Sequence, residues 1–250
     1  MTTTEPAPTL PTTPTDLVLD VRGVRRTFEA ENAPVRALRG TDFQMQRGEF
    51  VAIMGPSGCG KSTLLNLVAG LDQADEGTIV LADEEVTGKS EDELARMRRK
   101  HIGIVFQFFN LLEGMSVLEN VALPAMVAGL KRKPAETRGR DLLDLLGLSD
   151  KAKAAPGSLS GGQRQRLAIA RALANEPTLV LADEPTGALD SEGGQEVIEL
   201  FRRLHGNGQT ILMVTHDDEV AAAAQRIARM KDGKVVDPGD GSAAAAAPVG

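Results

Sequence analysis

Residues 50–62 have the sequence FVAIMGPSGCGKS, an apolar strand that runs into a glycine-rich turn. The turn, Gly55 to Ser62, matches the phosphate-loop pattern of Gly, four residues, Gly, Lys and then Ser or Thr. A helical pattern of apolar residues follows at Leu64, Leu65, Val68 and Leu71. A strand, a glycine-rich turn and a helix in this order predict a phosphate-binding site at the edge of an α/β sheet.

The residue types of this loop suit a nucleotide with several phosphates. Glycines let the backbone approach closely, so that N–H groups and the positive end of the helix point at the phosphate oxygens. Lys61 is expected to reach the β- and γ-phosphates of ATP, and the Ser62 hydroxyl to ligate Mg²⁺. The expected nucleotide-binding residues are Gly55, Pro56, Ser57, Gly58, Cys59, Gly60, Lys61, Ser62 and Thr63. The alternative, a turn that binds nothing, is disfavoured by the flanking strand and helix.

Cys59 is the only cysteine of the chain. An internal disulfide is therefore impossible, which fits a reducing compartment. A position beside the nucleotide predicts that a thiol alkylator blocks hydrolysis and that MgATP protects. A redox role for Cys59 is the alternative.

Continuous apolar runs at residues 16–21, 49–54, 178–182 and 210–214 predict strands buried on both faces of a parallel sheet. Residues 90–157 differ, because capping boxes (Ser90 with Glu93, Ser116 with Glu119) and a leucine stripe ending at Gly147 predict helices. We expect an α/β core over residues 16–236 with this helical subdomain inserted. Residues 1–15 and 237–250 are expected to be a disordered arm and tail.

The charge balance and hydropathy exclude some classes of protein. Lys and Arg number 28 against 35 Asp and Glu, and this net charge of −7 gives no general reason to bind nucleic acid or anionic lipid. No apolar run approaches the roughly 18 residues that span a bilayer. The first fifteen residues lack the basic start and apolar middle of a secretion signal. We expect a cytoplasmic chain that does not cross a membrane alone.

Two adjacent carboxylates, Asp183 and Glu184, end the apolar run that precedes them. Side chains alternate along a strand, so the two acids need not share a role. We expect Asp183 to hold Mg²⁺, through a water, and Glu184 to orient and deprotonate the water that attacks the γ-phosphorus. A solvated turn is the alternative.

The run Leu159-Ser-Gly-Gly-Gln163 resembles the LSGGQ motif that distinguishes ABC ATPases from other phosphate-loop proteins. Ser160 can cap a helix with Gln163 reaching back, which leaves Gly162 free to present N–H groups to an anion. The resemblance implies that Ser160, Gly161, Gly162 and Gln163 bind the γ-phosphate of ATP held by a partner subunit. It further implies a homodimer on ATP binding, and a phosphate-loop core with an added antiparallel β part.

Other positions resemble functional residues of the same family. Gln107 resembles the glutamine that contacts Mg²⁺ or the water and senses the γ-phosphate, and His216 the histidine that hydrogen-bonds it. Asp190 lies in a segment similar to the loop that touches the other subunit's catalytic site. Phe28 stands where many relatives have a tyrosine that stacks on adenine, and its π-face tolerates any base. A structural role for His216 and a core role for Phe28 remain alternatives.

The resemblance also implies a partner in the membrane. The family docks its integral membrane permease near Gln107, and the apolar run Phe108 to Leu112 suits such a contact, with ordinary core as the alternative. The segment Asn120-Val-Ala-Leu-Pro124 resembles the lipoprotein-releasing and macrolide-exporting branch. The implied function is an ATPase subunit at the inner face of the cell membrane. It would couple ATP-driven dimerisation to conformational change in the permease.

Three other functions explain the sequence less well. A non-transport ABC ATPase acting on DNA or ribosomes typically carries two cassettes or a long coiled-coil insertion, and this chain has neither. A phosphate-loop GTPase switch or a small-molecule kinase would leave residues 159–163 unexplained. The chain also lacks the Asn-Lys-x-Asp motif with which GTPases recognise guanine. A nucleotide-binding regulator without turnover would not need Glu184.

Overall fold

The computed structural model describes residues 16–29, 33–237 and 239 of the chain. The arm expected at residues 1–15 and most of the tail expected from residue 237 lie outside them. Asp237, expected to begin that tail, is instead the last residue of a strand, β10 (Lys234–Asp237).

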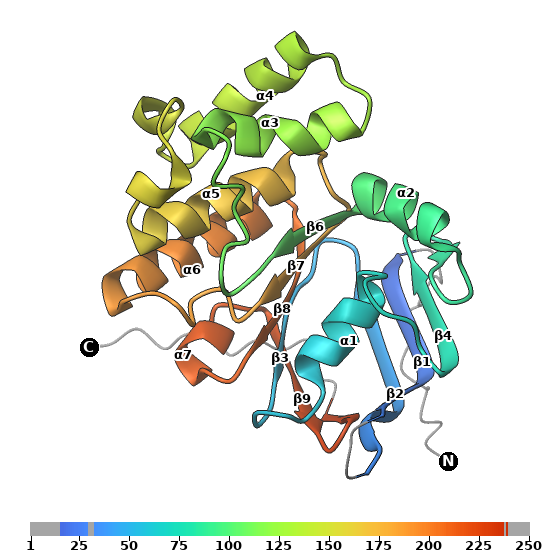
Figure 1. The fold of residues 1–250 in the computed structure, drawn as a ribbon. Coiled ribbons are helices and arrows are strands. Elements are labelled where there is room, and N and C mark those ends of the chain that lie inside the picture. Colours follow the sequence, from blue (N-terminus) through green and yellow to red (C-terminus); the bar gives the residue numbers. More distant parts are fainter. Residues whose placement is uncertain (1–15, 30–32, 238, 240–250) are drawn as a thin grey trace, which may run out of the picture.

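The described residues form two sheets (Figure 1). In the larger sheet the strand order is β10-β9-β3-β8-β7-β6, with β10 antiparallel to β9 and the others parallel. The smaller sheet, β2-β1-β4-β5, is antiparallel throughout. The strands are β1 (Leu17–Phe28), β2 (Val35–Gln46), β3 (Phe50–Met54), β4 (Glu76–Leu81), β5 (Glu84–Glu85), β6 (Ile102–Val105), β7 (Leu179–Asp183), β8 (Thr210–Thr215), β9 (Arg226–Lys231) and β10 (Lys234–Asp237).

The antiparallel sheet corrects one sequence-based expectation. The run at residues 16–21, predicted as a strand of the parallel sheet, starts β1 and pairs antiparallel with β2 and β4. Further along β1, buried Val21 and Val24 are separated by exposed Arg22 and followed by exposed Arg25. One face of β1 is therefore exposed to solvent, as is common in antiparallel sheets. The first five residues of the strand are too apolar to reveal this alternation.

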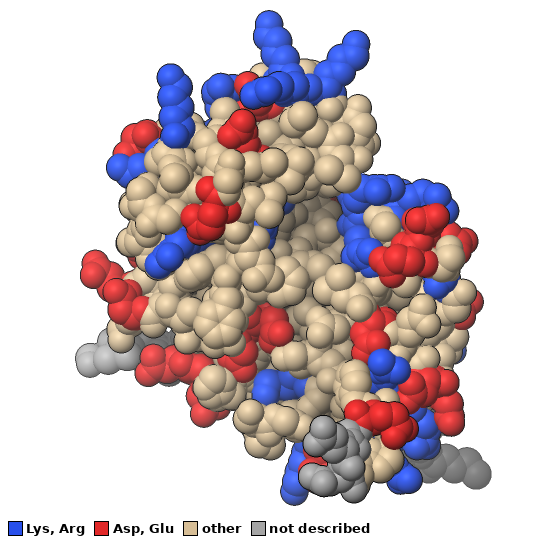
Figure 2. All heavy atoms as spheres, viewed as in Figure 1, with Lys and Arg blue, Asp and Glu red and all other residues tan. Residues whose placement is uncertain are grey.

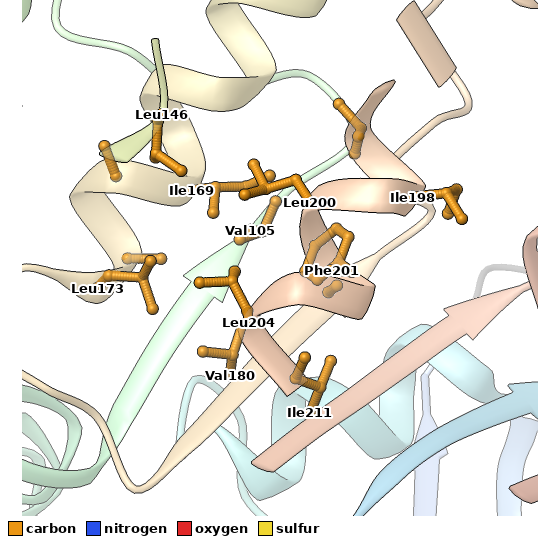
Figure 3. Close-up of a cluster of buried hydrophobic side chains, with 14 of the residues drawn as sticks. Val105, Leu146, Ile169, Leu173, Val180, Ile198, Leu200, Phe201, Leu204 and Ile211 are labelled. Carbon is orange, nitrogen blue, oxygen red and sulfur yellow. The ribbon is translucent and has the colours of Figure 1, made fainter. Parts of the chain in front are cut away.

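Side chains of the parallel strands divide the core in two. On β3, Phe50, Ala52 and Met54 join a cluster with the helices on one face of the sheet, and Val51 and Ile53 join a second cluster on the other face. Figure 3 shows part of the first cluster, where Phe201, Leu204 and Ile211 meet. The second cluster contains helix α1 (Lys61–Val68), which lies between the two sheets. Burial on both faces explains why these strands are continuously apolar.

Seven α-helices surround or bridge the sheets within the described residues. They are α1 (Lys61–Val68), α2 (Glu91–His101), α3 (Val117–Val127), α4 (Arg132–Leu145), α5 (Gly161–Leu173), α6 (Ser191–Gly206) and α7 (Asp218–Ala221). Short 3₁₀ turns occupy Ser149–Lys151 and Pro156–Ser158. None of these helices is both long and apolar enough to span a bilayer.

Most local predictions for residues 90–157 are confirmed. Capping boxes start α2 at Ser90 and α3 at Ser116, and Gly147, with φ 67°, follows the end of α4. The range is not wholly helical, however, because β6 lies inside it and is an edge strand of the parallel sheet. A four-residue strand between α2 and a loop gave too little pattern to be detected.

The helix after the glycine-rich turn is shorter than predicted. Helix α1 ends at Val68, and Gly70 has a left-handed φ of 62°. Leu71 is therefore outside the helix, and it is 48% exposed. Glycine adopts this conformation without strain, which explains why the helical pattern stops there.

Candidate nucleotide site

A cavity of about 750 Å³ lies where the phosphate loop, Gly55–Ser62, faces the segments that follow β6, β7 and β8. Ligands of parallel α/β sheets commonly bind at this carboxyl edge. The cavity brings together most of the residues predicted from the sequence. It is lined by Phe28, Val35, Ala37, Pro56, Ser57, Gly58, Gly60, Lys61, Ser62, Thr63, Gln107, Glu184 and His216.

Backbone geometry and one buried cation shape the phosphate loop. Gly60 has φ 106°, and a Cβ there would lie 2.5 Å from the carbonyl oxygen of Ala37, so only glycine fits. Lys61 is 7% exposed. Its Nζ donates to the carbonyl oxygens of Gly55 at 2.7 Å and Pro56 at 3.2 Å. The ammonium is thus held over the loop beside the cavity.

The hydroxyl of Ser62 donates a hydrogen bond of 2.9 Å to Oδ1 of Asp183. Burial raises the pKa of Asp183, and the negative charge of Glu184 raises it further. The hydrogen bond from Ser62 and the positive charge of Lys61 lower this pKa. A carboxylate that is costly to keep charged when buried beside another acid is stabilised by a nearby cation.

The chemistry of the proposed ligands fits Mg²⁺. Ser62, Gln107 and Asp183 offer oxygen atoms, which hard cations prefer. No cluster of three His, Cys, Asp or Glu side chains suited to a metal occurs in the part of the chain that the structure describes. Mg²⁺ usually binds one or two carboxylates together with substrate phosphates, so such a cluster is not required.

Glu184 leaves the direction of strand β7. Its φ is 44°, a left-handed conformation that costs a non-glycine residue about 1 kcal/mol or more. Its N–H donates to the carbonyl oxygen of Val214 at 3.0 Å, and its Oε1 lies 2.9 Å from Nδ1 of His216. The Glu184 side chain is 18% exposed and that of His216 is 69% exposed. The turn separates the directions of Asp183 and Glu184 and places Glu184 at the cavity wall.

Gln107 lies against the loop that follows Glu184. A Cβ on Gly187 would come within 2.7 Å of Nε2 of Gln107, so the two segments are in close contact. Gly187 N–H donates to the carbonyl oxygen of Glu184 at 3.0 Å. Further along, Oδ1 of Asp190 accepts from Gly193 N–H at 2.9 Å and caps α6. Within one chain, Asp190 is therefore a helix cap.

The predicted clamp, Ser160–Gln163, forms the capping box that the sequence indicated. Ser160 N–H donates to Oε1 of Gln163 at 3.0 Å, and Gln163 N–H donates to Oγ of Ser160 at 3.2 Å. None of the four clamp residues lines the cavity. One chain alone does not bring the clamp to the phosphate loop.

The exposure of Cys59 and of Phe28 shows where each side chain lies relative to the cavity. The Cys59 side chain is 6% exposed and does not line the cavity, so its thiol lies behind the phosphate loop, while its backbone remains part of that loop. It packs behind the loop, where its Sγ would lie 2.8 Å from a Cβ on Gly55. Phe28 is 38% exposed, lines the cavity and carries the guanidinium of Arg26 4.7 Å from its ring centroid. Phe28 is therefore not a core residue.

Val35 and Ala37 line the cavity but were not predicted. Both belong to β2, where Val35 pairs with Phe28 across the hairpin. Recognising β2 as the partner of β1 would have indicated that a residue facing Phe28 also borders the cavity. The β2 sequence gives only a weak strand signal because Arg, Gly, Thr, Asp and Gln interrupt it.

The chain is similar to known proteins along most of its length. The family model described as ABC transporter matches residues 38–187. The chain is 45% identical over 218 residues to an ABC transporter ATP-binding protein of Thermotoga maritima, covering 87% of this chain and 93% of the relative. It is 48% identical over 225 residues to the macrolide export ATP-binding/permease protein MacB of Nitrosomonas europaea, covering 89% of this chain but only 34% of that relative.

A solved structure is similar as well. It is titled a dimeric post-hydrolysis state of the ATP-binding cassette MJ0796 bound to ADP and Pi. The TM-score is 0.80 at 40% identity, covering 87% of this chain and 96% of that one. The chain belongs to the ABC transporter family, of which it is an ATP-binding cassette with the fold of an ATPase.

Proposed function

We propose that the cavity binds ATP with its adenine on Phe28 and its triphosphate on Gly55–Ser62. Lys61 contacts the β- and γ-phosphates, and Thr63 and the loop N–H groups surround the remaining oxygens. Ser62, Gln107 and Asp183 would hold Mg²⁺, which would neutralise charge on the β- and γ-phosphate oxygens. The oxygen chemistry of these donors and the 2.9 Å contact between the Ser62 hydroxyl and Asp183 support this assignment.

In this proposal Glu184 acts as the general base of hydrolysis. Its carboxylate takes a proton from the water that attacks the γ-phosphorus, and Gln107 helps to orient that water. His216 hydrogen-bonds the γ-phosphate. The contact of 2.9 Å between His216 and Glu184 supports placing both groups at the same end of the triphosphate.

The observation that carries the proposal is that the clamp, Ser160–Gln163, is formed but does not line the cavity of its own chain. N–H groups at the start of a helix are suited to bind an anion, and those of α5 do not face the phosphate loop of their own chain. Two chains related by a two-fold axis would place each clamp against the γ-phosphate on the partner's phosphate loop. ATP thus joins a homodimer, and hydrolysis releases it. The similar MJ0796 structure is titled dimeric.

We further propose that this dimer drives an integral membrane permease. A groove of about 430 Å³ opens between α2, β6, α3 and α5, and Figure 2 shows a hollow here with Lys and Arg on its α2 side. Phe108, next to Gln107, is 72% exposed, so the apolar run is not ordinary core at this position. A short permease helix that fills the groove would sense Gln107. The chain spans 34% of the length of its MacB relatives, which are macrolide export ATP-binding/permease proteins.

The remaining assignments follow from this arrangement. The ATPase domain is residues 16–237, one residue longer than expected because β10 ends at Asp237. It has a helical subdomain at about 90–157, and it acts at the cytoplasmic face of the cell membrane through the permease. The branch is that of lipoprotein-releasing and macrolide-exporting systems.

Complementation between two inactive variants tests the shared site. In Lys61→Ala the phosphate loop is defective, and in Ser160→Asp the clamp carries a charge that repels phosphate. A mixed dimer contains one intact composite site, made of the Ser160→Asp phosphate loop and the Lys61→Ala clamp. We expect each variant alone to be inactive and the mixture to hydrolyse ATP. A mixture as inactive as its components contradicts the shared site.

A further inference from the structure

One side chain of α5 holds both loops that carry the proposed reaction residues. Gln165 is 0% exposed, and its Nε2 donates to the carbonyl oxygen of Pro185 at 2.7 Å and to that of Phe106 at 3.4 Å. Pro185 directly follows Glu184, and Phe106 directly precedes Gln107. A single amide group therefore ties the backbone beside the base to the backbone beside the water-orienting glutamine.

The orientation of this amide is determined by its surroundings. An amide NH₂ has two hydrogens, and two carbonyl oxygens accept them here. Within the described ranges, Oε1 of Gln165 is buried and makes no hydrogen bond. Exchanging its oxygen and nitrogen would place three oxygens together without a proton between them, so the donor must face the two loops.

The same helix holds the far side of the Gln107 loop. Nη2 of Arg171 donates to the carbonyl oxygen of Phe109 at 2.8 Å, and Nη1 donates to that of Asn110. Phe109 and Asn110 have left-handed φ values of 58° and 49°. Non-glycine residues keep this conformation only where their surroundings enforce it. The guanidinium of Arg164, 5.3 Å from the Phe109 ring centroid, adds a further contact.

We propose that Gln165 is a positioning residue that sets the separation between Gln107 and Glu184. Arg171 anchors the Gln107 loop on α5, and Gln165 fastens that anchored loop to the segment after Glu184. The proposal rests on the proposed roles of Gln107 and Glu184. Gln165 itself does not line the cavity and contacts no group that binds the nucleotide.

The variant Gln165→Met tests this role because methionine fills similar space but donates no hydrogen bond. Misplacement of reacting groups by a fraction of an ångström to 1 Å costs up to about a hundredfold in rate. We expect kcat for ATP hydrolysis to fall by about ten- to a hundredfold, with the KM and the equilibrium affinity for ATP within about twofold of the original protein.

The chain offers a matched control in Gln209. Its Nε2 also donates to two backbone carbonyl oxygens, those of Pro177 and Thr210, both at 3.1 Å. These residues lie at the opposite end of β7 and β8, away from the cavity. Because Gln209 is less buried than Gln165, Gln209→Met is expected to lower the melting temperature by less than Gln165→Met does, and to leave kcat unchanged. Equal losses of kcat in both variants would mean a general structural effect and would overturn the proposal.

A second variant, Gln165→Glu, tests the hydrogen bonds through the pH dependence of kcat, which a change in packing alone would not alter. Gln165→Glu places a carboxylate against two carbonyl oxygens, and burial raises the pKa of such a group. When protonated it can donate to one carbonyl oxygen. We expect its kcat, divided by that of the original protein, to rise as the pH falls. A ratio that is independent of pH, or a Gln165→Met kcat within twofold of the original, overturns the role of Gln165.

The parallel variant Glu184→Gln separates this inference from the proposed function. If Glu184→Gln abolishes hydrolysis and Gln165→Met does not slow it, only the role of Gln165 fails. If Glu184→Gln hydrolyses ATP normally, the proposed function itself fails.

Discussion

Ser62 and Asp183 are 121 residues apart in the chain, yet the Ser62 hydroxyl lies 2.9 Å from the Asp183 carboxylate. In the sheet, β8 lies between β3, which leads into the phosphate loop, and β7, which ends at Asp183. The phosphate loop therefore extends past the end of β8 to reach Asp183. The fold of the chain itself thus brings two proposed Mg²⁺ ligands together. Preorganisation of this kind lowers the cost of binding.

Removal of the Lys61 ammonium should weaken ATP binding. Hydrogen bonds to charged groups contribute about 1.5–3 kcal/mol, so Lys61→Ala is expected to raise the Kd for ATP by about ten- to a hundredfold and to prevent ATP-dependent dimerisation. Titration calorimetry measures the Kd. Lys151→Ala is the control, because Lys151 pairs with Asp150 and does not line the cavity. Unchanged affinity in Lys61→Ala would contradict the assignment of the phosphate loop.

Stacking of the nucleotide base on Phe28 should increase the affinity for nucleotide without discriminating between adenine and guanine. Aromatic stacking on a base is worth roughly 1–3 kcal/mol, so Phe28→Ala is expected to weaken ATP and GTP by similar factors of about ten to a hundred. Fluorescence competition with both nucleotides measures this. Phe108→Ala removes another exposed aromatic side chain outside the cavity and should leave both affinities unchanged. A loss specific to ATP would show that Phe28 is part of a selective base pocket.

A methyl group on Gly187 should disturb Gln107. In Gly187→Ala the Cβ would lie 2.7 Å from Nε2 of Gln107, so this side chain must move. We expect kcat to fall about tenfold or more while ATP affinity changes little. Gly206→Ala is the matched control, since no atom lies within 4 Å of its Cβ position. Equal kcat values for the two variants in a steady-state ATPase assay would show that the contact with Gln107 is irrelevant to turnover.

The burial of Cys59 predicts slow alkylation. Because its side chain is 6% exposed, a maleimide should react much more slowly with the native protein than with the protein in urea. The single cysteine makes mass spectrometry of the adduct unambiguous. Rapid modification of the native protein that MgATP blocks would instead place the thiol in the nucleotide cavity.

The strands that are buried on both faces of the sheet were predicted from the sequence. Strands β3, β7 and β8 contain the unbroken apolar runs 50–54, 179–182 and 211–214, so their patterns were unambiguous. Strand β2 mixes Arg, Asp and Gln with buried Phe43 and Met45, and its identity depends on pairing with β1. Such long-range pairing cannot be read from local periodicity.

The site shows the same division. Residues in contiguous motifs, such as Gly55–Ser62, were identified together with their chemistry. Val35 and Ala37 enter the cavity only through the hairpin, and Gln165 looks like any polar residue of an amphipathic helix. Its importance emerges from the two carbonyl oxygens that the fold brings to it. The Cys59 thiol is buried behind the loop, because membership of a motif does not determine where a side chain points.

The central claim is that ATP is enclosed between two chains and hydrolysed with Glu184 as the base. Glu184→Gln keeps the size of the side chain and removes the base, so ATP should bind without being hydrolysed. Size-exclusion chromatography with light scattering, with and without MgATP, measures the mass of this variant. We predict a dimer with MgATP and a monomer without nucleotide, and ATP turnover reduced by at least about a hundredfold. A variant that stays monomeric in saturating MgATP, or that hydrolyses ATP at the normal rate, would contradict the account.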